Sequence, residues 1–176
     1  MGPHGFHVAT MASPVGELTL VANDARIRSI TRPNERPGRV GSAPGPVSSQ
    51  NHPILELCLR QLDEYFAGER TGFDVPLDLV GTDFQRAAWL SLATIPYGET
   101  VSYGEQARRL GRPKAARAVG AANGRNPISI ILPCHRVVGR DGALTGFAGG
   151  LDVKRALLEQ ERAVLPSTVD RTWLPT

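Results

Sequence analysis

The 176-residue chain has only two cysteines, Cys58 and Cys134, which lie far apart in unlike sequence contexts. So few thiols cannot form a disulfide framework, which predicts a reducing, cytoplasmic setting. No apolar run approaches the roughly 20 residues that span a bilayer, and the first seven residues have neither the basic start nor the apolar core of a secretory signal. With 41% hydrophobic and 21% charged residues, the composition is typical of a soluble globular protein without a membrane partner.

Metal-ligating residues are also scarce. Besides Cys58, the candidate ligands in the N-terminal part are His4, His7 and His52. Their spacing along the chain is not that of a zinc site. We therefore expect no metal and no other cofactor.

Acidic residues are nearly absent from one segment. Between Glu105 and Arg140, eight basic residues accompany a single acid, so the segment carries +7 and the rest of the +3 chain carries −4. A run of like charge is most often a solvated face. This run, however, falls on two short predicted helices that flank Gly111, which indicates a phosphate-binding helix-turn-helix.

Residues 1–80 predict an N-terminal α/β domain with a small antiparallel sheet and one helix. Its strands are indicated by alternating apolar residues, its helix by amphipathic spacing, and its long loop by Pro, Gly, Ser and Arg. The predicted elements are strands within 6–32, a flexible loop at about 33–51, a helix from Pro53 to near Gly68, and an extended piece at 73–79. Cys58 is interpreted as a packing residue of that helix.

Residues 82–162 predict a second, mostly helical domain, followed by a flexible tail at 163–176. The spacing of Thr82–Gln85 and of Ser102–Glu105 matches capping boxes that start two helices. The predicted elements are these two helices, a helix with Pro113 in its first turn after about three linking residues, a short strand carrying Cys134, and a helix at about 152–162. The fold class is therefore α+β, with a helix-turn-helix in the second domain.

The tetrapeptide Pro133-Cys134-His135-Arg136 follows the apolar run 128–132 and places a thiol beside an imidazole. Only the thiolate is a good nucleophile. A thiol with a pKa near 8.5 needs a base or a positive field, for which His135 and Arg136 are candidates. Neighbouring strand residues point to opposite faces, so adjacency alone leaves a buried structural cysteine as an equal alternative.

The motifs around Cys134 resemble those of the O6-alkylguanine-DNA alkyltransferases, which repair DNA by direct reversal. The resemblance covers roughly residues 82–161 in consistent order and spacing, and its specific part is the Cys-His-Arg motif with the upstream Asn-Pro. The matching pieces are Tyr97-Gly98-Glu99, Ser102-Tyr103, 113–120, Asn126-Pro127, 133–138, Gly149-Gly150, Lys154 and Leu157-Leu158. The resemblance implies irreversible, single-turnover transfer of the alkyl group from O6-alkylguanine, and from O4-alkylthymine, in DNA to Cys134.

For catalysis, the resemblance implies that His135 deprotonates Cys134 through an ordered water. Glu161 would hold the far ring nitrogen of His135 and stabilise the imidazolium, as a carboxylate does in a Ser-His-Asp triad. Glu159 on the same predicted helix is the competing carboxylate. Tyr103 would donate a proton or hydrogen bond to the purine, because a guanine anion is otherwise a poor leaving group.

The implied partner is double-stranded DNA containing O6-alkylguanine, bound by a monomer without an obligate protein partner. A base inside a duplex cannot reach a buried thiol, so the nucleotide must be flipped out. The resemblance implies that Arg117 fills the gap from the minor groove, while Ala115, Ala116 and Gly120 allow close approach. A phosphate contact is the alternative for Arg117, and tight helix packing is the alternative for the small residues.

The resemblance also implies a base pocket beside the cysteine. Asn126 would tie the turn before the cysteine to the helix-turn-helix. The pocket would be formed by Asn123, Val137, Leu144, Phe147, Ala148 and Gly149. Phe147 stands where tyrosine is frequent, and Ala148 where some relatives have serine. The backbone N–H of Ala148 and the carbonyls of Cys134 and Val137 remain available to read the purine edge.

Two other functions stay open from the sequence. A hydrolase or acyltransferase using Cys134 and His135 would need an oxyanion hole and would turn over many times. The predicted DNA-binding scaffold argues against it. A DNA module that binds lesions without repairing them would lack the reactive cysteine, so Cys134 itself discriminates against that function.

Overall fold

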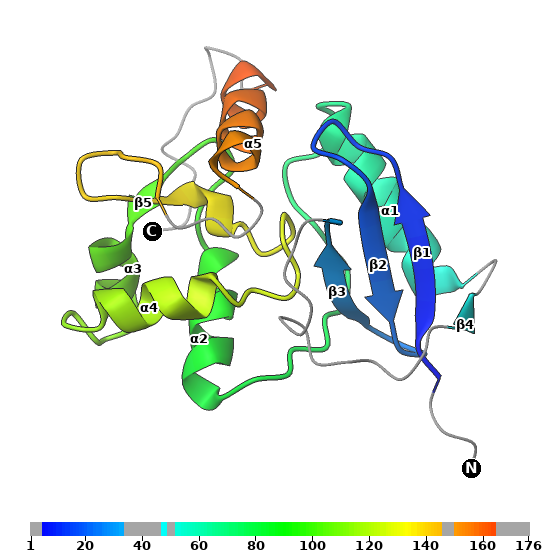
Figure 1. Ribbon diagram of the computed structural model, residues 1–176, viewed down its shortest axis with the longest axis horizontal. Coiled ribbons are helices and arrows are strands. Elements are labelled where there is room, and N and C mark those ends of the chain that lie inside the picture. The colour runs from blue at the N-terminus through cyan, green and yellow to red at the C-terminus, as the bar shows by residue number, and fades with distance from the viewer. Residues whose placement is uncertain (1–4, 34–46, 49–51, 146–149, 165–176) are drawn as a thin grey trace. The chain divides into compact units, whose positions relative to one another are not determined.

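The computed structural model describes residues 5–33, 47–48, 52–145 and 150–164 of the chain. The chain forms two compact units (Figure 1). The first contains Met1–Val80 together with Pro127–Ser129, and the second contains Gly81–Asn126 together with Ile130–Thr176. Across the described ranges, no helix combines the length and apolar character needed to cross a membrane.

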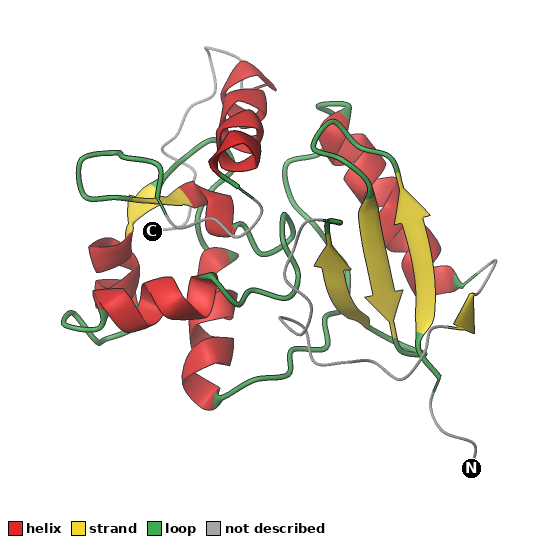
Figure 2. Cartoon of the chain, viewed as in Figure 1, coloured by secondary structure: helices red, strands yellow, loops and turns green. Residues whose placement is uncertain are grey.

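The first unit is a small sheet with a helix packed on one face (Figure 2). Its elements are β1 (His7–Met11), β2 (Leu18–Ala22), β3 (Ile27–Thr31), β4 (Val47–Ser48) and α1 (Pro53–Phe66). Strands β1 to β3 form an antiparallel meander, and β4 pairs with β1 in parallel, in the order β3-β2-β1-β4. Alternation along β2 buries Leu18, Leu20 and Ala22 in the core shared with Leu55 and Leu62 of α1. The predicted meander and helix are confirmed.

The outer edge of β3 is covered by two other stretches of the same unit. The backbone of Ile27 donates to Pro76 and accepts from Asp78, within the extended piece that the sequence predicts. The backbone N–H of Ile30 donates to the carbonyl of Pro127 at 3.0 Å. An uncovered edge strand would present unpaired backbone groups, so residues 127–129 complete this sheet although the sequence assigns them to the second domain.

The second unit is mostly helical. Its elements are α2 (Asp83–Leu92), β5 (Val101–Ser102), α3 (Tyr103–Arg109), α4 (Ala116–Asn123), the 3₁₀ turn η1 (Cys134–Arg136), β6 (Val137–Val138) and α5 (Leu151–Val164). Strands β5 and β6 pair in parallel. The indole N–H of Trp89 on α2 donates to the carbonyl of Ala122 on α4 at 2.8 Å. Helices α2, α3 and α4 therefore pack together as the helix-turn-helix core.

Of the two capping boxes that the sequence predicts, one forms completely and the other only in part. The Thr82–Gln85 capping box forms in both directions. At α3, Ser102 accepts from the N–H of Glu105, but the Glu105 carboxylate binds Arg108 and Arg109 instead of closing the box. The two arginines, one turn away, offer a charged partner that the backbone N–H does not.

The turn of the helix-turn-helix is longer than predicted. Residues 110–115 connect α3 to α4, and Pro113 lies in this turn instead of the first turn of α4. The N–H of Ala115 donates to the carbonyl of Arg112, which closes a separate turn before the helix. Ala115 then serves as the N-cap without a side-chain hydrogen bond, so the local sequence carries no capping signal at the true start.

Cys134 does not lie on a strand, which corrects the predicted short strand carrying it. It is the first residue of η1, and β6 begins only at Val137. Two features stop the apolar run from forming a regular strand. Ile130 has a φ of 76°, a left-handed conformation that a β-branched residue rarely adopts. Pro133 lacks the N–H that a strand ladder needs.

Candidate active site

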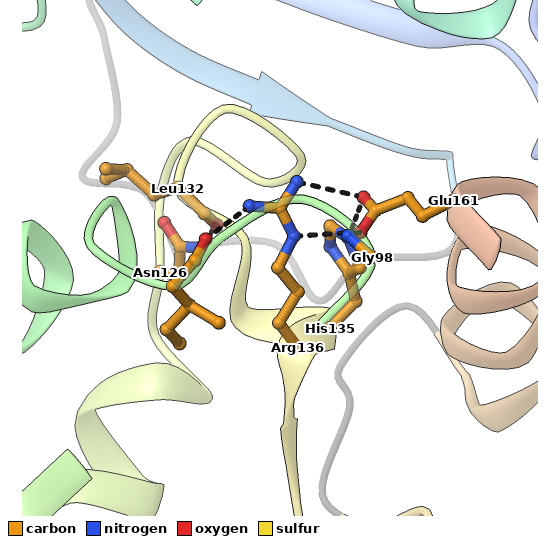
Figure 3. A network of polar contacts seen from close by, with 7 residues as sticks. Gly98, Asn126, Leu132, His135, Arg136 and Glu161 are labelled. Carbon is orange, nitrogen blue, oxygen red and sulfur yellow. Dashed lines mark hydrogen bonds and ion pairs between the residues drawn. The ribbon is translucent and has the colours of Figure 1, made fainter. Parts of the chain in front are cut away.

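The carboxylate of Glu161 is the centre of a buried polar network in the second unit (Figure 3). It projects from α5 and accepts from Nε2 of His135 at 2.7 Å. It also accepts from Nε and Nη2 of Arg136 at 2.8 and 3.1 Å, and from the backbone N–H of Gly98 at 3.2 Å. Burial opposes ionisation of Glu161, but the hydrogen bonds from His135 and Arg136, together with the charge of Arg136, prevail and hold the pKa of that carboxyl well below its usual range.

His135 is fully buried and presents one ring nitrogen as a base. A carboxylate can only accept, so Nε2 carries the proton shared with Glu161 and Nδ1 is unprotonated in the neutral ring. Within the described part of the chain, Nδ1 is buried and has no hydrogen-bond partner. Burial lowers the pKa of His135, and the hydrogen bond and charge of Glu161 act against this effect without cancelling it. The site therefore holds a neutral imidazole with an acceptor available for a proton.

The sequence makes Arg136 a candidate base or source of positive field for Cys134, but its contacts in the structure are those of an anchoring residue. Its guanidinium is buried, is bound by Glu161, and donates through Nη1 to the carbonyl of Ile95 at 2.7 Å. It also lies 5.5 Å from the ring centroid of Tyr97. Its charge is thus matched by the Glu161 carboxylate, so Arg136 anchors the network and is not a source of surplus positive field at Cys134.

Cys134 is buried at the start of η1, in the position next to His135. Its backbone N–H donates to the carbonyl of Leu132 at 2.8 Å. The buried side chain of Asn126 donates to the same carbonyl at 2.7 Å, and the N–H of Asn126 donates to Asn123 at the end of α4. Asn126 therefore contacts both the turn that carries the thiol and the end of α4.

Tyr103 begins α3, and its hydroxyl donates to the carbonyl of Thr145 at 3.0 Å. A Cβ added to Gly120 would lie 3.6 Å from the Tyr103 ring, so α4 approaches this ring closely at a residue without a side chain. Burial raises the pKa of the Tyr103 hydroxyl, and the hydrogen bond to Thr145 acts in the opposite direction. The hydroxyl therefore stays protonated at neutral pH and can act as a donor.

The predicted base pocket is only partly described. Val137 is buried on β6 and Leu144 is half-buried, whereas Phe147, Ala148 and Gly149 lie outside the described residues. Asn123 is buried and forms a reciprocal amide pair with Gln106 of α3, at 2.8 and 3.2 Å. Asn123 is therefore part of the packing contact between α3 and α4, whereas the resemblance implies that it helps to form the base pocket.

The exposed surface of α4 carries Arg117, and Ala115 and Ala116 at its start are half-buried. Nearby Arg112 lies 5.6 Å from the ring centroid of Phe84, so it is held against α2. Arg125 just after α4 is exposed. Arg117 therefore lies among small residues on α4, whereas Arg112 lies before this helix and Arg125 lies after it.

Three residues that could bind a metal come together in the first unit. His7, Asp24 and His52 each place one ligand atom within 4.8 Å of the others. Their sequence spacing gives no sign of this, because β1 begins beside the end of β2 and His52 precedes α1. Each also has a partner within the protein: His7 Nε2 lies 3.0 Å from Asp24, and His52 accepts from the N–H of Leu55 at the α1 N-cap.

Fold and site together define a class: a cysteine-based group-transfer protein built on a helix-turn-helix unit. Residues 83–163 match the family model described as 6-O-methylguanine DNA methyltransferase, DNA binding domain, and residues 6–79 match the ribonuclease-like domain of the same family. The chain belongs to the 6-O-methylguanine DNA methyltransferase family.

Relatives and solved structures agree with this family. The methylated-DNA–protein-cysteine methyltransferase of Mycobacterium tuberculosis (strain ATCC 25618 / H37Rv) is 50% identical over 164 residues, 92% of this chain and 96% of that protein. The protein of the same name from Methanosarcina acetivorans is 45% identical over 156 residues, 89% and 98% of the two chains. The crystal structure of Mycobacterium tuberculosis OGT in complex with DNA superposes with a TM-score of 0.79 at 50% identity, covering 92% and 96%. The predicted fold class and family are confirmed.

Proposed function

We propose that this protein repairs alkylated DNA by transferring the alkyl group from O6 of guanine to the sulfur of Cys134, once per chain. The observation that carries the proposal is the neutral His135, held through Nε2 by Glu161 with a free acceptor at Nδ1, next to Cys134. The M. tuberculosis and M. acetivorans relatives are named as methylated-DNA–protein-cysteine methyltransferases. A structure of the M. tuberculosis protein contains DNA.

The chemistry is a displacement at carbon. His135 takes up the Cys134 proton at Nδ1, and the sulfur forms a bond to the alkyl carbon as the bond from that carbon to O6 breaks. The electron pair of the broken bond moves onto the guanine, which takes up one proton, balancing the one that Cys134 gave up to His135, and leaves as ordinary guanine. The protein gains a thioether, which no step in the site reverses. O4-alkylthymine offers the same leaving oxygen and is proposed as a second substrate.

Tyr103 is proposed to assist the departure of the guanine. Its hydroxyl is a protonated donor at the first turn of α3, and donation to the purine would neutralise charge as it forms. Its present acceptor is the carbonyl of Thr145, so the substrate would have to replace that contact.

Intact-mass measurement after incubation with a duplex containing O6-methylguanine tests the proposed function. We expect one methyl group per chain, located on the peptide that carries Cys134, and no further product with excess DNA. Many product equivalents per chain would indicate a hydrolase instead, and DNA binding without an adduct would indicate a lesion-binding module.

Arg117 is proposed to occupy the space left by a flipped nucleotide, with α4 in the minor groove. Arg117→Ala should lower repair of the duplex by about 10-fold or more relative to reaction with the free O6-alkylguanine base, because only the duplex needs the vacancy filled. The measurement is the ratio of the two rate constants.

Arg125→Ala is the matched control, because this exposed arginine makes no side-chain contact among the described residues like the one that holds Arg112 against Phe84. It should weaken DNA binding and reduce the slope of log K against log salt by about one, with the ratio unchanged. Equal losses on both substrates for Arg117→Ala would reduce Arg117 to an electrostatic contact.

A further inference from the structure

A reciprocal pair of buried amides joins α3 to α4. Nδ2 of Asn123 donates to Oε1 of Gln106 at 2.8 Å, and Nε2 of Gln106 donates to Oδ1 of Asn123 at 3.2 Å. Both side chains are buried. Nε2 of Gln106 also donates to α2, at 3.2 Å from the carbonyl of Ala88 and 3.1 Å from the hydroxyl of Ser91. One glutamine side chain therefore contacts both neighbouring helices.

The amide pair lies one helical turn from the ring of Tyr103. Tyr103 precedes Gln106 by three positions on α3, and Gly120 precedes Asn123 by the same spacing on α4. Residues three apart on a helix share a face. A Cβ added to Gly120 would lie 3.6 Å from the Tyr103 ring. The facing surfaces of α3 and α4 thus meet in two successive contacts, first ring against glycine and then amide against amide.

These two contacts differ in how strictly they fix the position of α3 along and around α4, here called the register. Gly120 has no side chain, and apolar contact is non-directional, so the ring contact by itself permits α3 to rotate or slide. The amide pair opposes this motion, because a buried amide that loses its partner costs free energy. A fully satisfied buried polar network specifies one packing arrangement.

We propose that Gln106 and Asn123 are positioning residues, which hold the hydroxyl of Tyr103 in place for donation to the substrate by fixing the register of α3 on α4. This rests on the proposed function for the role of that hydroxyl in alkyl transfer. The register itself exists without substrate, since the hydroxyl already donates to the carbonyl of Thr145 at 3.0 Å.

NMR measures the register without substrate, through the nuclear Overhauser effect between the ring protons of Tyr103 and the Hα protons of Gly120. Gln106→Met keeps a side chain of similar length but removes the amide. We expect this effect to be present in the wild type and lost in Gln106→Met. Its retention in a folded Gln106→Met protein would overturn the proposal.

Gln61→Met is the matched control for loss of a buried glutamine. Gln61 is also buried, and its amide makes a reciprocal pair of hydrogen bonds with the backbone of Asp74 in the first unit, at 2.8 and 3.3 Å. Both variants should unfold at a lower urea concentration than the wild type. Only Gln106→Met should lose the contact between Tyr103 and Gly120, and its loss in Gln61→Met as well would reduce the effect to general destabilisation.

A double variant covers the case in which Gln106→Met does not fold. That substitution leaves the Asn123 amide buried without its partner, whereas Gln106→Met with Asn123→Leu removes both amides. The double variant should recover most of the stability but not the register. Loss of the contact between Tyr103 and Gly120 in this protein would support the proposal, and its retention would overturn it.

Transfer from the free O6-alkylguanine base connects the register to the reaction. Tyr103→Phe should lower the rate constant by about 100-fold, and Gln106→Met by about 10-fold because the hydroxyl is misplaced. The two losses should not multiply when combined, since a misplaced hydroxyl has little left to contribute. Losses that multiply would mean that the amide pair acts by another route, as general destabilisation would, and would overturn the positioning role.

Failure of the proposed function would be distinguishable from failure of this inference. A protein that loses the contact between Tyr103 and Gly120 in Gln106→Met, but transfers no alkyl group in its wild-type form, would keep the register and reject the repair activity. A protein that repairs DNA and retains this contact in Gln106→Met would keep the activity and reject the positioning role.

Discussion

Cys134→Ser is expected to lower alkyl transfer from duplex DNA by more than about 1,000-fold, with DNA binding nearly unchanged. The hydroxyl is far less acidic than the thiol, so neither His135 nor a neighbouring positive charge can generate the anion at neutral pH. Serine is close to cysteine in size, and the buried turn that holds position 134 should keep its fold. The measurement is single-turnover transfer of a labelled methyl group, with fluorescence anisotropy for DNA binding.

Cys58→Ser controls for loss of a thiol elsewhere. Cys58 is buried on α1 in the first unit, and its high pKa keeps it un-ionised. We expect this variant to accept one methyl group per chain, as the wild type does. Appreciable transfer by Cys134→Ser, or its loss in a folded Cys58→Ser protein, would remove Cys134 as the acceptor.

Glu161→Gln is expected to have two separate effects. The amide can no longer fix His135 with a negative charge, so transfer should slow by about 100-fold or more and the apparent pKa of Cys134 should rise. Arg136 also loses its buried counter-charge, which should lower the free energy of unfolding by about 3–5 kcal/mol. Transfer kinetics and urea denaturation measure the two effects independently.

The double variant Glu161→Gln with Arg136→Met separates them further. Removing both charges should restore part of the stability, because no buried charge is left unpaired, but it should not restore the transfer rate. Glu159→Gln is the matched control, since Glu159 is exposed on the same helix. If Glu159→Gln slowed transfer and Glu161→Gln did not, the proposed role of Glu161 would be wrong.

The low pKa of Glu161 also predicts how stability depends on pH. A carboxyl group whose pKa is lower in the folded than in the unfolded protein stabilises the folded state fully when the pH is above its unperturbed pKa, which is 4.5 here. This stabilisation decreases progressively as the pH falls below that pKa. The free energy of unfolding of the wild type should therefore drop as the pH falls below about 4.5. Glu161→Gln should lack this contribution, so the two proteins should converge in acid.

The sequence predicts features whose signal is local. The Thr82–Gln85 box starts α2 because both partners lie within one turn, and the motifs around Cys134 indicate the chemistry through their resemblance to a known family. The sequence gives no comparable local signal for side chains that come into contact only through packing of the helices. Glu159 and Glu161 lie on one short stretch of helix, and only the packing of α5 brings Glu161 to His135. The pairing of Asn123 with Gln106 likewise depends on how α3 meets α4.

Two local predictions failed for physical reasons that act over short distances. The apolar run before Cys134 reads as a strand, but the positive φ of Ile130 and the proline at 133 turn the chain instead. Pro113 can open a helix, but the turn closed by Arg112 and Ala115 delays α4 to Ala116. The apolar pattern is present before Cys134 and the helical pattern is present after Pro113. In each case the backbone conformation at one or two residues determines which secondary structure forms.

The edge contact between Ile30 and Pro127 has a consequence for synthesis on the ribosome. The backbone N–H of Ile30 is made early, but its acceptor is added almost one hundred residues later. Until then, the β3 edge of the nascent sheet has one backbone group unpaired and open to other chains. The sheet is therefore translated first, but its β3 edge is covered only after Pro127 has been added. Ribosomal pausing between Ile30 and Pro127 would prolong the time for which this edge is exposed.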